Sequence, residues 1–375
     1  MGSISRPSSP SPSPPSLQFD PTKHLSYQPP SSVISLADVS LPPSPISPVA
    51  SSVPFPLLSQ SAIHEHRKEL FSADALNNCL WHKRPDVAFI RGAAPRYAPF
   101  VHQFWTSPEV LAIVSSIAGE DLVPVMDYEI CHTNVQVGEG GLEGVRNTPV
   151  VPPLSTEQDR LGFERRMKAE VLEGDDDDSK ALVSWHRDSH PFVCVVMLSN
   201  SEFMTDGETE LQKGDGTTMK VRSPQMGHAV ILQGRSVSHI ARPAGNMKER
   251  ITIVTSFRPR DPRLYDDSSN MNVRGVSTLN ELYYQWTSYR LRLLSERFAI
   301  EAQKLDKKYE DNVAKTDSEG RVGLCRAETV DVNAVRKLMA EQVRYMERTV
   351  FEMRPVEDGD HFAKNAIPAM DEAVV

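Results

Sequence analysis

Four segments in the middle of the chain combine alternating or continuous apolar positions with many β-branched residues, which is the pattern of β-strands. They cover residues 128–137, 192–198, 229–233 and 250–257. Turns that contain Gly and Pro, such as those at residues 214–216 and 223–227, separate them. Short strands joined in this way are typical of an antiparallel jelly roll. We therefore predict a mainly β fold with flanking helices: a double-stranded β-helix, or cupin-like jelly roll.

Helical periodicity precedes and follows this strand region. Residues 64–80 and 97–117 have helical spacing, with a short extended piece at residues 87–91 between them. Beyond Pro262, apolar residues recur at steps of three and four after a capping box of Thr278 and Glu281: Leu279, Leu282, Trp286, Tyr289 and Leu293. A second helix ends before Pro355 and has one apolar face: Val335, Leu338, Met339, Val343, Met346 and Val350. We expect these two C-terminal helices to pack on the barrel or to form a homodimer surface.

Changes in composition along the chain suggest its organisation. Residues 1–55 are dominated by Ser and Pro and are expected to form a disordered tail. Residues 60–265 are expected to form the jelly-roll domain, and residues 138–180 to form a polar rim insertion, as a loop or a short helix. A helical extension is expected over residues 270–355, followed by a tail over residues 356–375.

Charge and composition narrow the class of protein. The formal net charge of -9 argues against a nucleic-acid partner. No run of about 18 apolar residues is present to span a bilayer, and the N-terminus lacks the order of a secretory signal, so no membrane association is expected. The four cysteines are scattered without a CxxC pair, which fits buried apolar residues in a reducing compartment. The expected location is cytoplasmic, and the expected partner is a small molecule.

The sequence around His186 contains a candidate metal site. In His186-Arg187-Asp188 the imidazole and the carboxylate point to the same side of a strand, because side chains alternate with a period of two. His239, after several more strands, supplies a second imidazole. Two histidines and one carboxylate leave three positions open on an octahedral ferrous ion, enough for a bidentate co-substrate and dioxygen.

His-x-Asp alone is a short motif with other interpretations. It also occurs in surface turns, and His-Arg-Asp belongs to the kinase catalytic loop, but no Gly-rich loop, strand lysine or Asp-Phe-Gly accompanies it here. His190 shares the parity of the two ligands, but a fourth protein ligand would fill a position needed for chemistry, so we expect it beside the metal and not on it. His132 and His228 are expected to be ordinary histidines.

Arg250 opens an apolar strand and could hold a carboxylate through two hydrogen bonds, with Thr252 donating from the same face. The alternative is an edge arginine paired with a surface acid. Arg242 and Arg258 are the other candidates for this role.

The order of these motifs resembles that of the fungal Fe(II)/2-oxoglutarate dioxygenases, over about residues 85–262. The resemblance rests on the Trp-His-x-Asp motif at residues 185–188, the segments 206–211 and 227–235, His239, and Arg250 with Thr252. It implies Fe(II) on His186, Asp188 and His239, 2-oxoglutarate anchored by Arg250, and consumption of O2 with release of succinate and CO2. The substrate would be a small organic molecule, in the setting of fungal secondary metabolism.

The resemblance also suggests that the strand starting at Tyr128 lines the pocket. Tyr128, Asn134 and Gln136 would share one face and contact the co-substrate, although polar residues facing water would give the same pattern. Two alternative functions stay open at this stage. One is a non-redox, cupin-like metalloenzyme, against which Arg250 and Thr252 argue; the other is a non-catalytic binding protein, against which the complete ligand set argues.

Overall fold

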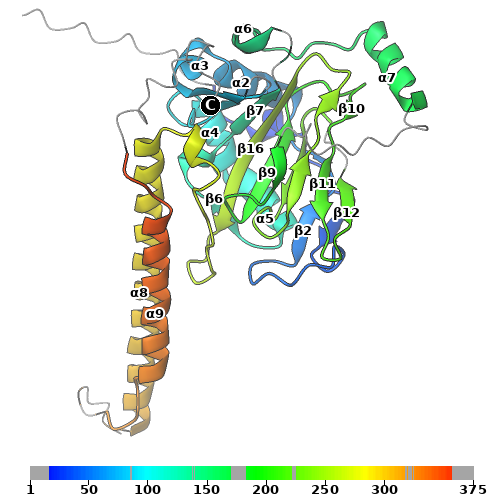
Figure 1. Cartoon of the computed structure of the whole chain (residues 1–375). Coiled ribbons are helices and arrows are strands. Elements are labelled where there is room, and N and C mark those ends of the chain that lie inside the picture. The colour runs from blue at the N-terminus through cyan, green and yellow to red at the C-terminus, as the bar shows by residue number, and fades with distance from the viewer. Residues whose placement is uncertain are drawn as a thin grey trace, which may run out of the picture.

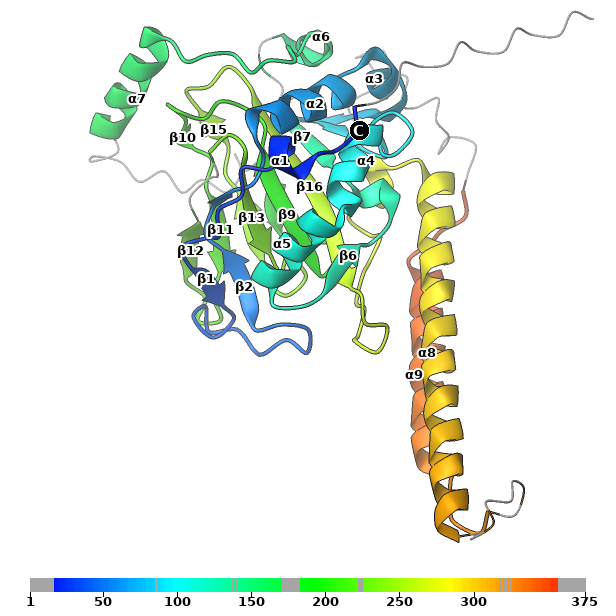
Figure 2. The same ribbon diagram turned by 180° about the vertical axis from the view of Figure 1, so that it is seen from behind.

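The computed structural model describes residues 17–84, 87–136, 138, 140–169, 183–221, 225–316, 319, 323 and 325–356. Antiparallel sheets form its centre, helices cover one side, and a long helical hairpin extends away from it (Figures 1 and 2). The prediction of a mainly antiparallel β fold with flanking and C-terminal helices is confirmed at this level. None of the described helices combines the length and the apolar character needed to cross a bilayer.

A large sheet forms one wall, with the strand order β1-β2-β13-β9-β16-β7-β5-β4, while β3 pairs with β13 and β6 with β16. The strands are β1 (Val33–Ser35), β2 (Val49–Ser52), β3 (Phe55–Pro56), β4 (Leu80–Arg84), β5 (Val87–Ile90), β6 (Leu122–Pro124), β7 (His132–Gln136), β9 (Phe192–Met197), β13 (His228–Leu232) and β16 (Arg250–Pro259).

A smaller sheet has the order β12-β11-β14-β8, and a two-stranded ribbon joins β10 to β15. Its strands are β8 (Val183–His186), β11 (Thr209–Gln212), β12 (Thr218–Val221) and β14 (His239–Ala241), and the ribbon contains β10 (Thr205–Asp206) and β15 (Ala244–Gly245). Residues of both sheets line one shared cavity, so the small sheet faces the large one.

The two faces of the large sheet have different partners. Along β9, Phe192, Cys194 and Val196 pack with the helices in the main hydrophobic core. Val193, between them, packs toward the small sheet with Leu211. This alternation is what a period of two produces when both faces of a strand are covered. It also leaves every second residue of the central strands free to line the space between the sheets.

Short helices cover the outer face of the large sheet. They are α1 (Pro21–His24), α2 (Gln60–Leu70), α3 (Ala73–Cys79), α4 (Pro99–Thr106) and α5 (Pro108–Ala118). The periodicity over residues 97–117 is thus divided between α4 and α5. Ser107 is the boundary, because its side chain caps α5 by accepting from the amide of Val110, and Pro108 occupies the first turn.

The prediction of a disordered tail up to residue 55 is wrong from residue 17 onward. β2 pairs with β1 and, through Ser51, with Leu232 of β13. Leu36 and Phe55 are fully or nearly fully buried in the core. The few apolar residues of this Ser- and Pro-rich segment therefore add strands to an existing sheet, which composition alone does not reveal. Residues 1–16 lie outside the described residues.

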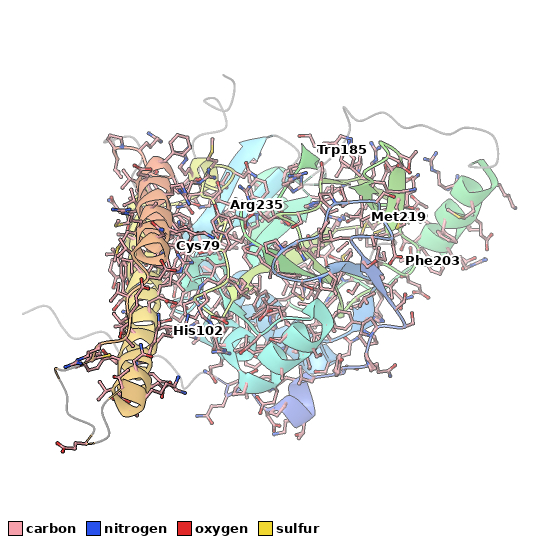
Figure 3. All side chains as sticks on the ribbon, turned by 90° about the horizontal axis from the view of Figure 1, so that it is seen from below. Cys79, His102, Trp185, Phe203, Met219 and Arg235 are labelled. Atoms are coloured by element: carbon pink, nitrogen blue, oxygen red, sulfur yellow. The ribbon has the colours of Figure 1, made fainter. Side chains whose placement is uncertain are left out.

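The rim insertion contains two helices among its described residues, α6 (Gly141–Arg146) and α7 (Glu157–Ala169). Phe163 of α7 contacts Phe203, with ring centroids 6.1 Å apart, on the side of the sheets opposite the hairpin (Figure 3). Residues 170–180 of the insertion, which include a run of four aspartates at 175–178, lie outside the described residues.

The C-terminal hairpin consists of α8 (Leu279–Thr316) and α9 (Val332–Phe351). The predicted buried face of α8 is confirmed, since Leu282, Trp286 and Leu293 are buried there. For α9 the first of the two predicted alternatives, packing of the apolar face on the sheets, is wrong: Gln342, Tyr345 and Thr349 are its buried residues, and the apolar face is exposed. The second alternative, a homodimer surface, stays a prediction. Two one-turn 3-10 helices, η1 (Asp127–Glu129) and η3 (Arg274–Val276), lie between the barrel and this hairpin.

Candidate metal centre

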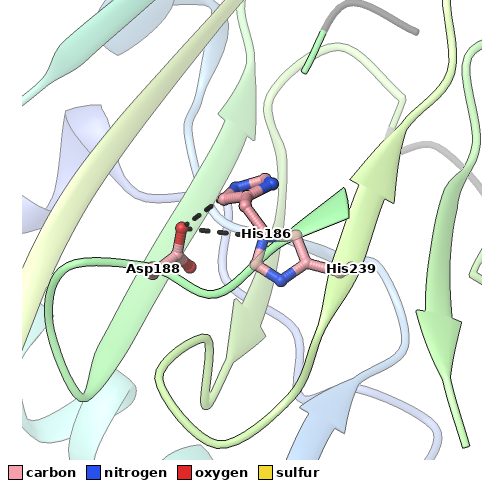
Figure 4. A group of neighbouring side chains, drawn as sticks. All are labelled: His186, Asp188 and His239. Carbon is pink, nitrogen blue, oxygen red and sulfur yellow. Dashed lines mark ion pairs between the residues drawn. The ribbon is translucent and has the colours of Figure 1, made fainter. Parts of the chain in front are cut away.

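Strand pairing in the small sheet brings His186, Asp188 and His239 together (Figure 4). His186 is the last residue of β8 and His239 the first of β14, and the two are register partners in the antiparallel pair. Asp188 follows β8 by two residues, and its amide donates to the carbonyl of Gly234 at 2.9 Å. The sequence motif and the distant histidine thus meet at one point of the structure.

The three side chains have the spacing of a metal ligand set. One ligand atom from each lies within 4.8 Å of the other two. Asp188 Oδ1 is 3.4 Å from His186 Nε2 and 3.6 Å from His239 Nε2. Two imidazoles and one carboxylate on one side of an ion form a facial ligand set, which suits ferrous iron with open positions.

Hydrogen bonds on the far side of each ring fix which nitrogen is available. His186 Nδ1 lies 2.8 Å from the carbonyl oxygen of Ser184, and His239 Nδ1 lies 3.0 Å from that of Val237. A carbonyl only accepts, so each Nδ1 carries the proton and donates. Each Nε2 then keeps its lone pair, as a metal ligand requires.

Asp188 is held in a narrow space beside a glycine. A Cβ built on Gly234 would lie 1.7 Å from Asp188 Oδ2 and 2.5 Å from Asp188 Cγ. Oδ2 is buried and has no hydrogen-bond partner among the described residues. A buried carboxylate oxygen without a donor is costly unless a cation or another group compensates it.

The charges within the trio favour an ionised carboxylate. Burial acts to raise the pKa of Asp188, but the neighbouring imidazoles of His239 and His186 outweigh it, and the pKa is lowered. Burial lowers the pKa of His239 and is only partly offset by Asp188. For His186, burial is outweighed by Asp188, and the pKa is raised.

The trio faces a cavity of about 410 Å³ between the two sheets. Polar and aliphatic side chains both line it, and the aliphatic ones include, from three strands of the large sheet, Val193, Val195, Val230, Leu232 and Val254. Asn134, Gln136, Arg250 and Thr252, all predicted from the sequence, line it as well. Arg250 pairs in register with Gln136, and Thr252 with Asn134, so the four form one polar patch on β7 and β16.

Arg250 is the unbalanced charge of this patch. Its side chain is 8 % exposed, and its Nε has no hydrogen-bond partner among the described residues. Burial lowers the pKa of Arg250 to about 10, which leaves the guanidinium charged at neutral pH. Gln136 donates to the carbonyl of Ala244 at 3.2 Å, while its Oε1 is buried and also lacks a partner in the described part of the chain.

The two other arginine candidates are used elsewhere. Arg242 forms an ion pair with Glu210, with 3.0 Å between Nε and Oε1. Arg258 lies over the ring of Tyr289 in the hairpin, 5.4 Å from its centroid. Neither residue lines the cavity, so Arg250 is the one of the three candidates that does.

The predicted position of Tyr128 is wrong. It lies in η1 and not on β7, because the strand begins only at His132, after Cys131 adopts a φ of 56°. Its side chain is buried against α8, and its hydroxyl accepts from the amide of Thr278 at 2.8 Å. Tyr128 therefore joins the barrel to the hairpin and does not line the cavity.

A second polar group in the cavity was not predicted. Glu129, fully buried, forms an ion pair with Arg91, and His190 Nε2 lies 3.6 Å from Glu129 Oε2. Arg91 also donates to Nδ1 of His132. We expected His132 to be ordinary, but it lines the cavity; only the parity of His190 with the metal motif was a signal for this group.

The charges of this second group balance. Burial acts to raise the pKa of Glu129, but Arg91 and the neighbouring histidines outweigh it and hold the pKa well below its usual range. Burial and the positive charge of Arg91 lower the pKa of His132 to about 3, so this ring is neutral. With Nδ1 accepting from Arg91, its Nε2 donates to Oδ1 of Asn134 at 3.1 Å. The NH2 group of Asn134 is then the donor available on the cavity wall.

No family model matches the chain, and no curated protein matches it. Solved structures similar to it include a Pseudomonas putida prolyl-4-hydroxylase, at 17% identity and a TM-score of 0.30 over 54% of this chain and 89% of that one. A 2OG-Fe(II) oxygenase family protein from Burkholderia pseudomallei has 10% identity and a TM-score of 0.30 over 53% and 89%. The α-ketoglutarate-dependent epimerase SnoN from nogalamycin biosynthesis has 12% identity and a TM-score of 0.34 over 52% and 72%. At these identities and TM-scores the similarity carries no argument about the function of this chain.

Proposed function

We propose that this chain is an Fe(II)- and 2-oxoglutarate-dependent dioxygenase with a double-stranded β-helix core, and that it oxidises a small organic molecule. The observation that carries the proposal is one cavity that contains both a facial His/Asp/His set and a buried arginine without a carboxylate partner among the described residues. The first suits ferrous iron, and the second suits the anionic end of a co-substrate.

His186, Asp188 and His239 would hold the metal, with both Nε2 atoms already directed by hydrogen bonds to backbone carbonyls. Bound Fe(II), with 2-oxoglutarate and O2, would supply the oxidising chemistry, and 2-oxoglutarate would leave as succinate and CO2. The three protein ligands leave three positions for these reactants. Asp188 also contributes a negative charge that offsets part of the charge of the ion.

Arg250 and Thr252 would bind the distal carboxylate of 2-oxoglutarate. A guanidinium presents two parallel N–H donors to a carboxylate, and Thr252 lies two residues further along the same strand face. Asn134 and Gln136, their register partners on β7, would supply further hydrogen bonds. Tyr128 is excluded from this role by its position against α8.

The remaining part of the cavity indicates the kind of substrate. Ser256 lies six residues beyond Arg250 on the same face of β16, a separation of roughly 20 Å along an extended strand, and its hydroxyl contacts Glu129 at 3.5 Å. Polar side chains therefore line the cavity from the Arg250 end to the Glu129 end, connected on β7 by the hydrogen bond between His132 and Asn134, and aliphatic side chains of β9 and β13 line it as well. The Arg250 end would take an anion, whereas the balanced Arg91 and Glu129 end would take an uncharged hydroxyl, carbonyl or amide.

Buried polar atoms support this second end as a substrate contact. Both ring nitrogens of His190 and the hydroxyl of Ser189 have no hydrogen-bond partner among the described residues, and both side chains line the cavity. We propose a small molecule that carries both apolar groups and an uncharged hydrogen-bonding group. Hydroxylation and desaturation of such a molecule are both compatible with the site.

Two other functions would use the same barrel. A non-redox metalloenzyme would need the metal trio but not a buried Arg250 whose Nε has no hydrogen-bond partner in the described part of the chain. A binding protein without catalysis would need neither. The presence of both features in one cavity favours the dioxygenase.

Anaerobic titration tests the proposal. Fe(II) is added to purified apo-protein, followed by 2-oxoglutarate, and the expected result is a weak visible charge-transfer band that saturates with one equivalent of co-substrate. Admission of O2 should then produce succinate. Fe(II) binding without the band would favour a non-redox metalloenzyme, and no Fe(II) binding would favour a binding protein; either result would refute the dioxygenase.

A further inference from the structure

The C-terminal hairpin is much larger than the barrel needs for support. α8 and α9 lie side by side, and their far ends extend well away from the sheets in both views (Figures 1 and 2). With 38 residues, α8 is about 57 Å long at a rise of about 1.5 Å per residue. Helices of this length are stable in water mainly through packing of an apolar face.

The half of the hairpin next to the barrel has such packing. Val125 and Met126 of the barrel lie in one hydrophobic cluster with Trp286 of α8 and Tyr345 of α9. Trp286 Nε1 donates to the carbonyl of Thr349 at 3.1 Å, and the guanidinium of Arg290 lies 3.6 Å from the ring centroid of Tyr345. This half is therefore fixed to the barrel by both apolar and polar contacts.

The distal half is different. From Phe298 to Asn312 of α8, and from Val332 to Glu341 of α9, no described residue is buried. Apolar side chains are nevertheless present there, and Phe298, Leu305, Val335 and Met339 are between 37 % and 47 % exposed. Two helices that bury no side chain fully over this length gain little from lying together in one chain.

The exposed apolar residues form a continuous stripe on each helix. On α8 they recur every seven residues, at Tyr284, Leu291, Phe298 and Leu305. On α9 they recur at steps of three and four, at Val335, Met339, Val343, Met346 and Val350. A repeat of seven that is kept over several turns is the signature of a helix that packs along its length against other helices.

Small residues lie between the successive large residues of the α8 stripe. Ser288, Ser295 and Ala302 each follow a large stripe residue by four and precede the next by three. The result is an alternation of large and small side chains along one seam. Such a surface accepts large side chains, like those of the α9 stripe, at its small positions.

The angle between the exposed stripe of α9 and the face of α9 that packs on α8 suggests how many helices pack together. Val343 follows the buried Gln342 by one residue, and Met346 follows the buried Tyr345 by one. One residue is about 100° around a helix, so the stripe lies roughly a quarter turn from the face that meets α8. A helix in a four-helix bundle contacts two neighbours at about this angle.

We infer that the hairpin is one half of an intermolecular four-helix bundle and that the occupant of the exposed stripes is the hairpin of a second copy of this chain. When two identical hairpins are related by a twofold axis, the same stripes of each copy face each other, so the same surface forms both sides of the interface. Each copy then contributes both the α8 seam, in which large and small side chains alternate, and the α9 stripe of large apolar side chains.

Area and charge support this choice of occupant. The nine stripe residues are on average about half exposed, and half of a large side chain is on the order of 80 to 100 Å². Each copy would thus bury roughly 800 Å², which is the usual size for one side of a stable protein interface. Acidic and basic residues alternate around the stripes, as at Glu301, Lys304, Asp306 and Lys307, so a membrane or a nucleic acid would meet repulsive charges.

Analytical ultracentrifugation of the full-length chain tests the inference between about 0.1 and 50 µM. The expected species at the upper end has twice the chain mass of 41.8 kDa. Leu291→Lys, Phe298→Lys and Met339→Lys should each raise the dimer Kd at least about a hundredfold, because each removes a central apolar contact and buries a charge. Gln303→Lys is the matched control: it adds the same side chain to an exposed position on the opposite side of α8 and should leave the Kd unchanged.

Hydrogen exchange distinguishes the second copy from other occupants. Amides of residues 298–312 and 332–341 should be protected at 50 µM and should lose protection at 0.1 µM or in Phe298→Lys. Circular dichroism and the Fe(II)·2-oxoglutarate band report whether the variants keep a folded barrel. A wild-type chain that is monomeric at every concentration, a dimer that the three stripe variants leave intact, or protection that does not depend on concentration would each overturn the inference.

Discussion

Gly234 and Asp188 are in direct contact: the Asp188 amide donates to the Gly234 carbonyl at 2.9 Å, and the Asp188 carboxylate occupies the space that a side chain at position 234 would need. Gly234 begins the turn between β13 and β14, in the segment that leads to His239. The backbone that delivers the second histidine thus also sets the position of the carboxylate. The three ligands are coupled through this contact, although they are far apart in the sequence.

Gly234→Ala should therefore weaken Fe(II) binding without removing a ligand. The added Cβ would lie 1.7 Å from Asp188 Oδ2 and 2.8 Å from its Cβ, so the whole Asp188 side chain must move. Loss of ligand orientation typically costs about 10- to 100-fold in metal affinity. Anaerobic Fe(II) titration followed by calorimetry measures it. Gly144→Ala, which meets no atom within 4 Å, is the control, and equal affinities in the two variants would contradict the coupling.

Replacement of a ligand should have a larger effect. His186→Ala, Asp188→Ala and His239→Ala each remove one of three protein ligands, so we expect no measurable succinate formation at saturating Fe(II). Asp188→Ala is the variant that an added anion such as formate could rescue in part. Near wild-type turnover in any of the three would show that the ligand set is misassigned.

Local sequence was enough to nominate the trio, because the strand period places His186 and Asp188 on one side, and the pairing of β14 with β8 brings His239 to them. It was also enough to find Arg250 and Thr252 on one strand face. It did not reveal Arg91 and Glu129, which belong to different segments and are joined only by the packing of β5 against η1. Tyr128 was misplaced because the left-handed conformation at Cys131 separates it from β7, and no sequence signal marks a non-glycine residue with positive φ.

The N-terminal segment shows the same limit in another form. Its Ser and Pro content predicted disorder, yet the amide of Gln233 donates to the carbonyl of Ala50 at 2.8 Å, and the Gln233 side chain donates to the carbonyls of Ser47 and Val49. These contacts depend on an edge strand that the rest of the fold supplies. A segment with few apolar residues can be ordered when each of them packs into a site that the rest of the fold provides.

Deletion of residues 1–55 should therefore destabilise the protein strongly, contrary to the prediction from composition. It removes β1 and β2 and the buried Leu36, Val39 and Phe55. At about 2 kcal/mol for each buried side chain, the loss is comparable to the total stability of a typical domain. Thermal unfolding and soluble yield measure the effect. Deletion of residues 1–16 is the control, and an unchanged melting temperature in both deletions would contradict the packing of this segment.

Stability should fall with acid through His66. Its Nε2 accepts from Trp105 Nε1 at 3.2 Å, while Nδ1 donates to the carbonyl of Ala62 at 2.8 Å, so only the neutral ring satisfies both. Burial lowers the pKa of His66 from its ordinary 6.5 to about 4. A lowered folded-state pKa means that this contribution is complete above pH 6.5 and is lost as the pH falls toward 4.

The loss through His66 between pH 7 and pH 4.5 should be about 2 to 3 kcal/mol. Urea unfolding of wild type and His66→Gln measures it, because the amide can make both hydrogen bonds and does not titrate. The free energy of unfolding of wild type minus that of His66→Gln should fall by this amount between pH 7 and pH 4.5. Other acid-sensitive groups contribute equally to both proteins and cancel in this difference. A difference that stays constant with pH would show that His66 does not titrate with folding.

Arg250 provides the sharpest separation between metal binding and co-substrate binding. The metal ligands lie on β8, on β14 and just after β8, whereas Arg250 opens β16, so Arg250→Ala should bind Fe(II) as wild type does. Loss of a charge-assisted bidentate contact to a buried partner costs on the order of 2 to 4 kcal/mol, or roughly thirty- to thousandfold in the Kd of 2-oxoglutarate. Arg250→Lys should recover part of this loss, since a point charge remains without the planar pair of donors.

Arg258→Ala is the matched control, because that guanidinium lies over Tyr289 outside the cavity. The midpoint of the charge-transfer band in a 2-oxoglutarate titration measures all three, and a midpoint for Arg250→Ala equal to that of Arg258→Ala would remove Arg250 from the proposed site.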